Sequence, residues 1–396
     1  MHNLKNNIWK VYIFGFFNGM HFLGAVLIPF FTDWIKIDYG QIMILQTVFL
    51  LSSLLSEIPT GVIADKYGRK YSLQLAVVAT MIGILFYISY PSFWIVMIGE
   101  IFWGIGQSLF SGAGEAFMYD TLKQLNREKE SKKMFANAEN FFLTGLMVAA
   151  PIGSLIYFLT GDLRMPLVFM LAPQLVALII SFTFIEPQRF DKVKESYRYI
   201  NILRDGVKAF WQHKILKVLA LDMVTIAVIA YFIIFFYQGL LMKLGMEIKY
   251  LGLIQFITLA AQIIVISQYR RFEKVLKSKK GLIILSAFLT GIAYIMLGLT
   301  NYMPLIIIFI VMAAGFGLTR EPLFSSYMNK YIESDKRATV MSCINMLRTL
   351  CLVILNPLAG YMANWSIQNT LLILGVIAIG FAIISNFRIK EEMLID

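Results

Sequence analysis

The amino-acid sequence predicts an all-α membrane protein with twelve transmembrane helices in two six-helix pseudo-symmetric halves. Of its 396 residues, 59% are hydrophobic and only 15% are charged, whereas soluble domains carry about 25% charged residues. Apolar runs of about 20 residues, the length that crosses a bilayer, also follow one another along the chain. Spans and short loops fill the sequence, so no room remains for a soluble catalytic domain.

Short polar or proline-containing segments separate the apolar runs. The shortest breaks are Tyr90–Ser92 and Asn301–Tyr302. The first run is too long for the core of a signal peptide, so we interpret it as a span that stays in the protein. The expected spans are residues 10–32, 40–63, 71–90, 93–118, 135–160, 164–185, 215–242, 249–269, 281–300, 303–329, 338–363 and 368–388.

The distribution of basic residues predicts the orientation. One set of alternating loops and termini contains 29 lysines and arginines, and the other set contains four. Because basic loops stay in the cytoplasm, we expect both termini to be cytoplasmic, in a plasma membrane. Topology thus explains the net charge of +11, and we expect no nucleic-acid partner. Cys343 and Cys351 lie in one apolar run and indicate neither a disulfide framework nor a metal site.

The longest polar stretch, residues 186–214, separates an N-terminal half (1–185) from a C-terminal half (215–396). Its charges are mixed with aromatic residues, which fits either an interfacial helix or a plain linker. A faint repeat with an offset of 203 residues supports the two halves. The repeated glycines are Gly112 with Gly315 and Gly114 with Gly317. Parallel halves with a solute site between them are a known transporter plan.

The loop after the second span has an unusual spacing of glycine, aspartate and basic residues. Gly61 permits close helix approach, Gly68 suits a tight turn, and Asp65 can cap a helix N-terminus or pair with a cation. Arg69 and Lys70 suit anionic head groups. Topology alone would explain the basic residues but not the spacing of the glycines and the aspartate. The segment reads Gly61-Val62-Ile63-Ala64-Asp65-Lys66-Tyr67-Gly68-Arg69-Lys70.

This motif, between the second and third of twelve spans, resembles the signature of the major facilitator superfamily. The resemblance implies a secondary carrier in which this loop latches the cytoplasmic gate. Drug–proton antiporters of that superfamily carry an arginine four residues before a Gly-x-Gly in the fourth span. Here Glu100 holds that position before Gly104-Ile105-Gly106, so antiport by that route is not implied. The glycine-rich fifth-span signature is matched only in part, from Gly145 to Gly153.

Several ionisable residues fall inside the expected spans, where they are costly and indicate function by default. The proton-coupling or ion-pair candidates are Glu57, Glu100, Glu115 and Arg348. A carboxylic acid in apolar surroundings can hold its proton near neutral pH, which suits a proton carrier, but each of these groups could equally form a structural ion pair. Arg348 requires an acidic partner, for which Glu57, Glu100 and Glu321 are the options. Asp222 is expected to reach water at the inner end of span seven.

The resemblance implies that spans one, four, seven and ten line a central substrate cavity. Adjacent Arg320 and Glu321 point about 100° apart on a helix, so one can bind a solute or close a gate while the other pairs with a neighbouring helix. The substrate-cavity candidates are Asn18, His21, Gln107, Tyr231, Tyr237, Arg320 and Glu321.

These features favour a secondary active transporter that moves a small solute by alternating access. We expect proton-coupled export of a lipophilic or cationic compound. Proton-coupled uptake of a nutrient or organic anion, bound by Arg320 and Arg348, is the first alternative, and a receptor or scaffold on a transporter fold is the second. An enzyme is not indicated, because the sequence has no nucleotide-binding loop, metal-ligand cluster or interpretable catalytic triad. We expect a monomer in the lipid bilayer with no cofactor.

Overall fold

The computed structural model describes residues 2–188, 210–211, 213–328, 331–332, 337–390 and 393–394. Within these residues, twelve helical stretches are long and apolar enough to cross a membrane, from Leu4–Ile35 to Ile367–Arg388. The expected twelve spans are confirmed, including the short breaks before Phe93 and Met303. An interfacial helix in the segment 186–214 stays a prediction, because residues 189–209 and 212 lie outside the described residues.

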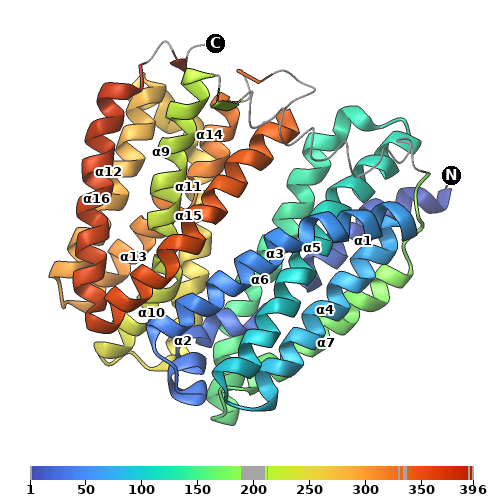
Figure 1. Ribbon diagram of the computed structural model, residues 1–396, viewed down its shortest axis with the longest axis horizontal. Coiled ribbons are helices and arrows are strands. Elements are labelled where there is room, and N and C mark those ends of the chain that lie inside the picture. The colour runs from blue at the N-terminus through green and yellow to red at the C-terminus, as the bar shows by residue number, and fades with distance from the viewer. Residues whose placement is uncertain are drawn as a thin grey trace. The chain divides into compact units, whose positions relative to one another are not determined.

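The chain forms two compact units. Unit 1 comprises Met1–Glu195 and Glu247–Phe256, and unit 2 comprises Ser196–Met246 and Ile257–Asp396. In unit 1, α1, α4, α5, α6 and α7 lie side by side (Figure 1). The elements of unit 1 are α1 (His2–Asn18), η1 (Phe22–Val26), α2 (Leu27–Pro29), η2 (Phe30–Ile35), α3 (Tyr39–Tyr67), α4 (Arg69–Ser89), α5 (Phe93–Gln124), η3 (Glu128–Glu130), α6 (Ser131–Thr160), α7 (Met165–Phe182) and η4 (Ile248–Tyr250), followed by the first turns of α11 (Leu251–Leu276).

The first span is interrupted near its middle. α1 ends at Asn18, and the chain resumes at Phe22 as a 3-10 helix, a single α-turn and the π-helix η2. The Asn18 carbonyl accepts a hydrogen bond of 3.2 Å from Gln174 Nε2 of α7. Irregular backbone at membrane depth requires such partners, because lipid cannot satisfy its polar groups. The sequence does not reveal this break, since apolar residues continue through it.

Helices α1 and α6 pack with their backbones almost in contact. A Cβ atom at Gly19 would lie 2.3 Å from the Phe142 carbonyl oxygen, and one at Gly145 would lie 2.1 Å from the Phe16 carbonyl oxygen. Small residues allow this approach in membrane helices, where close van der Waals packing drives association. The glycines therefore hold the interrupted first span firmly against α6.

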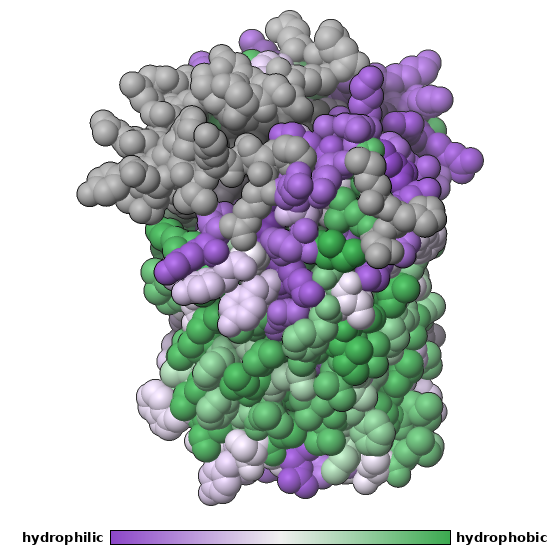
Figure 2. Space-filling model, turned by 90° about the vertical axis from the view of Figure 1, so that its right-hand side faces the viewer, coloured by the Kyte–Doolittle hydropathy of each residue, from purple (hydrophilic) through white to green (hydrophobic). Residues whose placement is uncertain are grey.

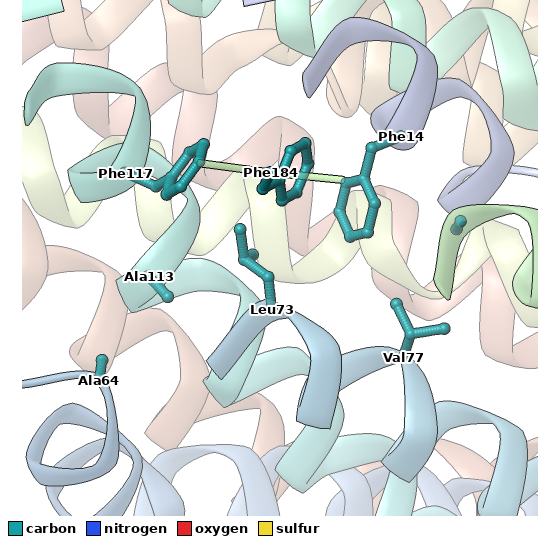
Figure 3. Packing of buried hydrophobic residues seen from close by; sticks show 8 residues of the cluster. Phe14, Ala64, Leu73, Val77, Ala113, Phe117 and Phe184 are labelled. Carbon is teal, nitrogen blue, oxygen red and sulfur yellow. The ribbon is translucent and has the colours of Figure 1, made fainter. Parts of the chain in front are cut away.

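A buried hydrophobic cluster connects α1, α3, α4, α5 and α7 in unit 1 (Figure 3). The Phe184 ring lies between Phe14, at 5.5 Å between ring centroids, and Phe117, at 5.0 Å. Leu73 and Val77 of α4 belong to the same cluster (Figure 3). This packing fixes the helices that carry the polar residues described below.

Unit 2 is also helical, and its tenth span is interrupted as well. α13 ends at Gly317 and α14 begins at Arg320. The intervening Thr319 accepts a hydrogen bond of 2.8 Å at its carbonyl from the Tyr269 hydroxyl, and its own hydroxyl bonds the Gly315 carbonyl at 2.5 Å. The remaining helices are α9 (Lys214–Tyr231), α10 (Ile233–Lys243), α12 (Lys279–Leu299), α13 (Met303–Gly317), α14 (Arg320–Met328), α15 (Arg337–Trp365) and α16 (Ile367–Arg388).

The outer surface has the character expected of a protein in lipid. Figure 2 shows one face on which hydrophobic side chains cover a broad area and hydrophilic side chains gather mainly at one end. Large apolar side chains such as Leu55 and Trp94 are 74% and 70% exposed. Exposed apolar area on this scale is rare on soluble monomers and marks contact with a membrane or a partner.

Candidate functional site

Unit 1 contains a cavity of about 320 Å³ between α1, α5 and α6, with Leu73 of α4 at its wall. Four phenylalanines supply most of the apolar lining. The complete lining is Val11, Phe14, Gly15, Leu73, Gln107, Phe110, Ser111, Gly114, Glu115, Met118, Phe135, Ala138, Glu139 and Phe142. A mostly apolar concave site with a few polar groups is the usual form of a small-molecule site.

The polar groups of this cavity lie on two helices. Gln107, Ser111 and Glu115 follow one another at four-residue spacing along one face of α5, and Glu139 faces them from α6. The side chains of Gln107, Glu115 and Glu139 are exposed, so a solute can reach them. None of the described residues that line the cavity is lysine, arginine or histidine. The charge of the lining is therefore acidic.

His21 and Asn18 lie at the break of the first span. The His21 ring hydrogen-bonds the Asn18 carbonyl and lies 6.0 Å from Trp103 and 6.3 Å from Phe142 between ring centroids. Phe142 also lines the cavity. His21 is thus linked to the cavity through Phe142 without lining it.

Glu100 lies nearer the N-terminal end of α5 than the cavity does, and it is not part of the cavity lining. Its side chain is 2% exposed, because α5 packs closely against α3 and α4. Gln46 Nε2 donates a hydrogen bond of 3.1 Å to Glu100 Oε1, and the Tyr87 hydroxyl bonds the same carboxyl group. Within the described part of the chain, Glu100 forms no ion pair.

Glu57 and Glu115, the other acidic candidates at membrane depth, are exposed rather than enclosed. Because Glu57 is exposed, it is not the carboxyl group in apolar surroundings that a proton carrier requires. Its side chain also has no hydrogen-bond or ion-pair partner among the described residues, so it does not pair with Arg348. Glu115 instead belongs to the cavity lining. The structure therefore gives Glu100 and Glu115 two different environments on one helix.

The segment Gly61–Lys70, called the gate motif after the role that the family resemblance implies, covers the end of α3, the turn at Gly68 and the start of α4. Gly68 connects the two helices with φ of +121°, the left-handed region that glycine tolerates. The Glu186 carboxylate accepts hydrogen bonds of 2.8 Å from the backbone N–H groups of Arg69 and Lys70. Lys70 Nζ donates to the Phe182 carbonyl at 2.8 Å. The end of the sixth span thereby caps the start of the third.

Arg69 of the motif pairs with Asp120 at the far end of α5. Its guanidinium donates to the Asp120 carboxylate and to the Ala116 carbonyl, and the Asp120 side chain is only 3% exposed. Asp65 is exposed on α3. Arg69 therefore connects the start of α4 to the end of α5. It does not point to a lipid head group, the other role that a basic residue at this place suits.

Gly61 does not make the close helix contact expected of it. Among the described residues, no heavy atom lies within 4 Å of the position that a Cβ at Gly61 would take, once its own helix is excluded. The same holds for Gly112 of α5. A requirement for glycine at position 61 would therefore have to come from another conformation of the protein.

Glu186 is expected to stabilise the gate motif through its two backbone hydrogen bonds. A carboxylate at a helix N-terminus contributes about 0.5–1 kcal/mol, so Glu186→Ala should lower the melting temperature of the purified protein slightly and slow transport. Gln188→Ala is the matched control, since among the described residues the Gln188 backbone N–H bonds a neighbour, Gln124 Oε1, at 3.0 Å and its side chain has no hydrogen-bond partner. Identical melting and transport in both variants would contradict this role.

In unit 2, Arg320 lies in a fully buried ion pair. Its guanidinium donates to the Asp222 carboxylate, to Ser286 Oγ and, at 2.8 Å, to the Ile283 carbonyl. Ser385 Oγ donates to the other Asp222 oxygen. The side chains of Arg320 and Asp222 are 0% and 2% exposed. Asp222 therefore does not reach water as expected, and Arg320 links α14, α9 and α12 instead of lining an open cavity.

Glu321, the neighbour of Arg320, pairs with Arg348. Arg348 Nη1 lies 2.6 Å from Glu321 Oε2, and both side chains are more than a third exposed. Of the three acidic partners considered for Arg348, Glu321 is the one found. The two adjacent residues of the tenth span thus contribute to two separate ion pairs, one buried and one accessible.

The aromatic candidates of the seventh span lie in unit 2. Tyr237 is buried, and its hydroxyl accepts a hydrogen bond of 3.0 Å from Gln238 Nε2. Tyr231 is partly exposed and its ring lies 5.3 Å from that of Phe235. Tyr231 therefore packs against aromatic neighbours, whereas the hydrogen-bond partner of the buried Tyr237 is the Gln238 amide.

Three contributors to these sites are not apparent from the sequence. They are Glu186, Gln174 and the partnership of Asp222 with Arg320. Gln174 is 0% exposed and its Oε1 atom has no hydrogen-bond partner in the described chain. A glutamine inside span six is the only advance signal, since polar residues at membrane depth seldom lack a function or a partner.

The twelve candidate spans define a polytopic membrane protein, and unit 1 contains an accessible cavity. Residues 11–356 match the Major Facilitator Superfamily, and the chain belongs to this family. It is a multi-pass membrane secondary transporter and not an enzyme. The antiporter subtype is not part of this assignment.

Two curated bacterial relatives are themselves described only as transporters. The uncharacterized MFS-type transporter YxaM of Bacillus subtilis (strain 168) is 23% identical over 309 residues, covering 77% of this chain and 76% of that protein. The uncharacterized transporter BU466 of Buchnera aphidicola subsp. Acyrthosiphon pisum (strain APS) is 30% identical over 105 residues, or 26% of each chain.

Solved structures share the fold at low sequence identity. The nucleoside transporter NupG superposes with a TM-score of 0.77 at 13% identity, covering 97% of this chain and 99% of that one. A bacterial homolog of the human lysosomal transporter Spinster, inward-facing and unoccupied, gives 0.75 at 16% identity and 98% and 97% coverage. A D-xylose-proton symporter gives 0.73 at 14% identity, with 98% of each chain covered.

Proposed function

We propose that this transporter exports lipophilic or cationic compounds in exchange for protons. The observation that supports this proposal is the cavity of unit 1, which combines four phenylalanine side chains with Glu115 and Glu139 and has no basic lining residue. Aromatic faces attract organic cations, and carboxylates add Coulomb attraction. The volume of about 320 Å³ lies at the lower end of the range of ligand pockets.

The ion pairs of unit 2 favour a cation over an anion as the solute. Uptake of an organic anion would need an accessible positive charge from Arg320 or Arg348. Arg320 is fully buried against Asp222, and Arg348 is neutralised by Glu321 at 2.6 Å. The Arg320 guanidinium is therefore enclosed, and the charge of the accessible Arg348 is offset by Glu321, whereas the accessible cavity of unit 1 carries acidic groups without a basic lining residue.

The expected orientation gives the direction of this exchange. We infer that both termini are cytoplasmic, from the 29 basic residues on one side against four on the other. Export would then carry the solute out of the cell and protons in, across the plasma membrane, with the monomer as the working unit. Fusion of a fluorescent protein to the C-terminus tests this orientation, because it fluoresces in the bacterial cytoplasm and not after export in an unfolded state.

Accumulation of ethidium in energised cells with and without the protein tests export. We expect lower accumulation in cells that contain the protein, and we expect an uncoupler to abolish the difference. Glu115→Gln should remove most of the effect and weaken tetraphenylphosphonium binding to the purified protein roughly tenfold, equivalent to about 1.4 kcal/mol. Because glutamine has nearly the same size as glutamate, the negative charge of Glu115 would then be responsible for the effect.

Glu128→Gln is the matched control, because it removes the same charge outside the cavity and Glu128 has no ion pair among the described residues. Equal ethidium accumulation in cells with and without the wild-type protein would contradict the proposal. In that case, uptake of labelled organic anions would be the next measurement, with Arg348→Gln as the diagnostic variant.

A further inference from the structure

Glu100 is deeply buried, and its hydrogen-bond partners among the described residues are neutral. The side chain is 2% exposed, and its partners are the Gln46 amide of α3 and the Tyr87 hydroxyl of α4. An ionised carboxylate removed from water loses several kcal/mol of solvation, and two neutral donors offset only part of that cost. A protonated carboxyl group avoids most of it.

In the part of the chain that the structure describes, the groups that face Glu100 are neutral. Tyr87 is the titratable side chain that faces it, and Gln46 is neutral. Tyr87 is surrounded in turn by Phe30 and Phe31 of the broken first span, at ring centroid distances of 5.9 and 6.1 Å, and by Trp103 at 5.0 Å. No lysine, arginine or histidine within the described residues contacts the Glu100 carboxyl group. The aromatic rings exclude water from this network.

The Glu100 network and the acidic cavity are distinct places on one helix. Glu100 is seven residues from the start of α5, and Glu115 follows it after fifteen residues, which corresponds to about 22 Å along a helix axis. The cavity lining contains Gln107, Ser111 and Glu115 but not Glu100, Gln46 or Tyr87. A solute in the cavity therefore does not touch the Glu100 carboxyl group.

We propose that Glu100, Tyr87 and Gln46 form a proton-binding site of unit 1 that is separate from the solute cavity. Glu100 takes one proton from water when the network is open and returns one proton to water when it opens to the other side. In the closed arrangement described here the proton is retained. Tyr87 and Gln46 are positioning residues, and the interrupted first span, through Phe30 and Phe31, is the element that must move to admit water.

Separate sites imply that protons and solute are coupled through conformational change and not by competition for one carboxylate. This coupling rests on the proposed export function, whereas the proton binding itself does not. A transporter of another solute would use the same site, because the burial of Glu100 is independent of what the cavity binds.

Infrared spectra of the purified full-length protein in lipid nanodiscs, compared between the wild type and single variants, test the proton site directly. The wild-type protein should show the carbonyl-stretch band of a protonated, buried carboxyl group at neutral pH, and Glu100→Gln should lack it. Tyr87→Phe should shift the frequency of this band, since it removes one hydrogen bond to the carboxyl group. Glu57→Gln is the matched control, because Glu57 is an exposed glutamate at membrane depth, and it should retain the band.

A band that persists unchanged in Glu100→Gln, or that disappears in Glu57→Gln, would overturn the assignment. If Glu100→Gln fails to fold, an unchanged frequency of the carbonyl-stretch band in Tyr87→Phe would overturn the assignment. In proteoliposomes, Glu100→Gln should bind tetraphenylphosphonium as the wild type does but lose transport driven by a pH gradient. If wild-type proteoliposomes move no tetraphenylphosphonium, the export proposal fails, while the infrared result still decides whether Glu100 holds a proton.

Discussion

Replacement of Asp222 by asparagine is expected to destabilise the protein strongly, because it leaves the buried Arg320 guanidinium without a counter-charge. The two side chains are 2% and 0% exposed. Removal of one partner from a buried ion pair costs about 3–5 kcal/mol, since the remaining charge stays desolvated. The melting temperature of the purified protein should fall by many degrees, and the yield of folded protein in the membrane should fall with it.

The neighbouring ion pair of Glu321 and Arg348 supplies a matched control. Its side chains are 38% and 37% exposed, and accessible pairs contribute roughly 1 kcal/mol or less. Glu321→Gln should therefore leave the melting temperature almost unchanged. Replacing both members of the buried pair, in Asp222→Leu with Arg320→Met, should recover much of the stability. Equal destabilisation by Asp222→Asn and Glu321→Gln would contradict a distinct role for the buried pair.

The sequence predicts the helical architecture well because the bilayer imposes one dominant constraint. Each span must be apolar for about 20 residues, and this signal is local in sequence. The turn at Gly68 is also predictable from the sequence, since only glycine readily adopts the φ of +121° found there. The pairing of Arg348 with Glu321 was one of three options, and sequence alone could not choose among them.

Interactions between distant segments could not be predicted in the same way. Asp222 looks like a solvated residue near a span end, and its burial depends on Arg320, 98 residues further on. Glu186 caps α4 from 117 residues away through Arg69 N–H. At the break after Asn18, Gln174 of α7 bonds the Asn18 carbonyl from 156 residues away. In each case a polar side chain hydrogen-bonds the backbone of another helix or pairs with its charge. Hydrophobic periodicity does not indicate such long-range partners.

The polar residues of α5 illustrate why burial decides function at membrane depth. Glu100 and Glu115 have the same chemistry and lie on the same helix, yet one is enclosed by Gln46 and Tyr87 and the other lines an accessible cavity. Sequence places both among the proton-coupling candidates. We propose separate roles for them, with a proton at the enclosed site and a cation at the accessible one.

Alanine at Gly145 is expected to be the most damaging of the small substitutions, because the new Cβ would lie 2.1 Å from the Phe16 carbonyl oxygen. A backbone atom cannot rotate away as a flexible side chain can, so α1 and α6 would have to separate. Overpacking typically costs about 1–3 kcal/mol, and this contact should lie at the upper end of that range or above. The melting temperature and the folded yield of Gly145→Ala should both fall.

Alanine at Gly61 should have the opposite profile. No heavy atom of the described residues lies within 4 Å of its added Cβ outside its own helix, and alanine favours a helix over glycine by about 1 kcal/mol. Gly61→Ala should therefore melt no lower than the wild type. Its transport should nevertheless be slowed, because a glycine in the gate motif is needed only if helices approach it closely in another state of the cycle. Gly112→Ala, with similar free space on α5, controls for the added methyl group. Unchanged transport in Gly61→Ala would remove Gly61 from the gate, whereas a lower melting temperature would show that its surroundings are already closed.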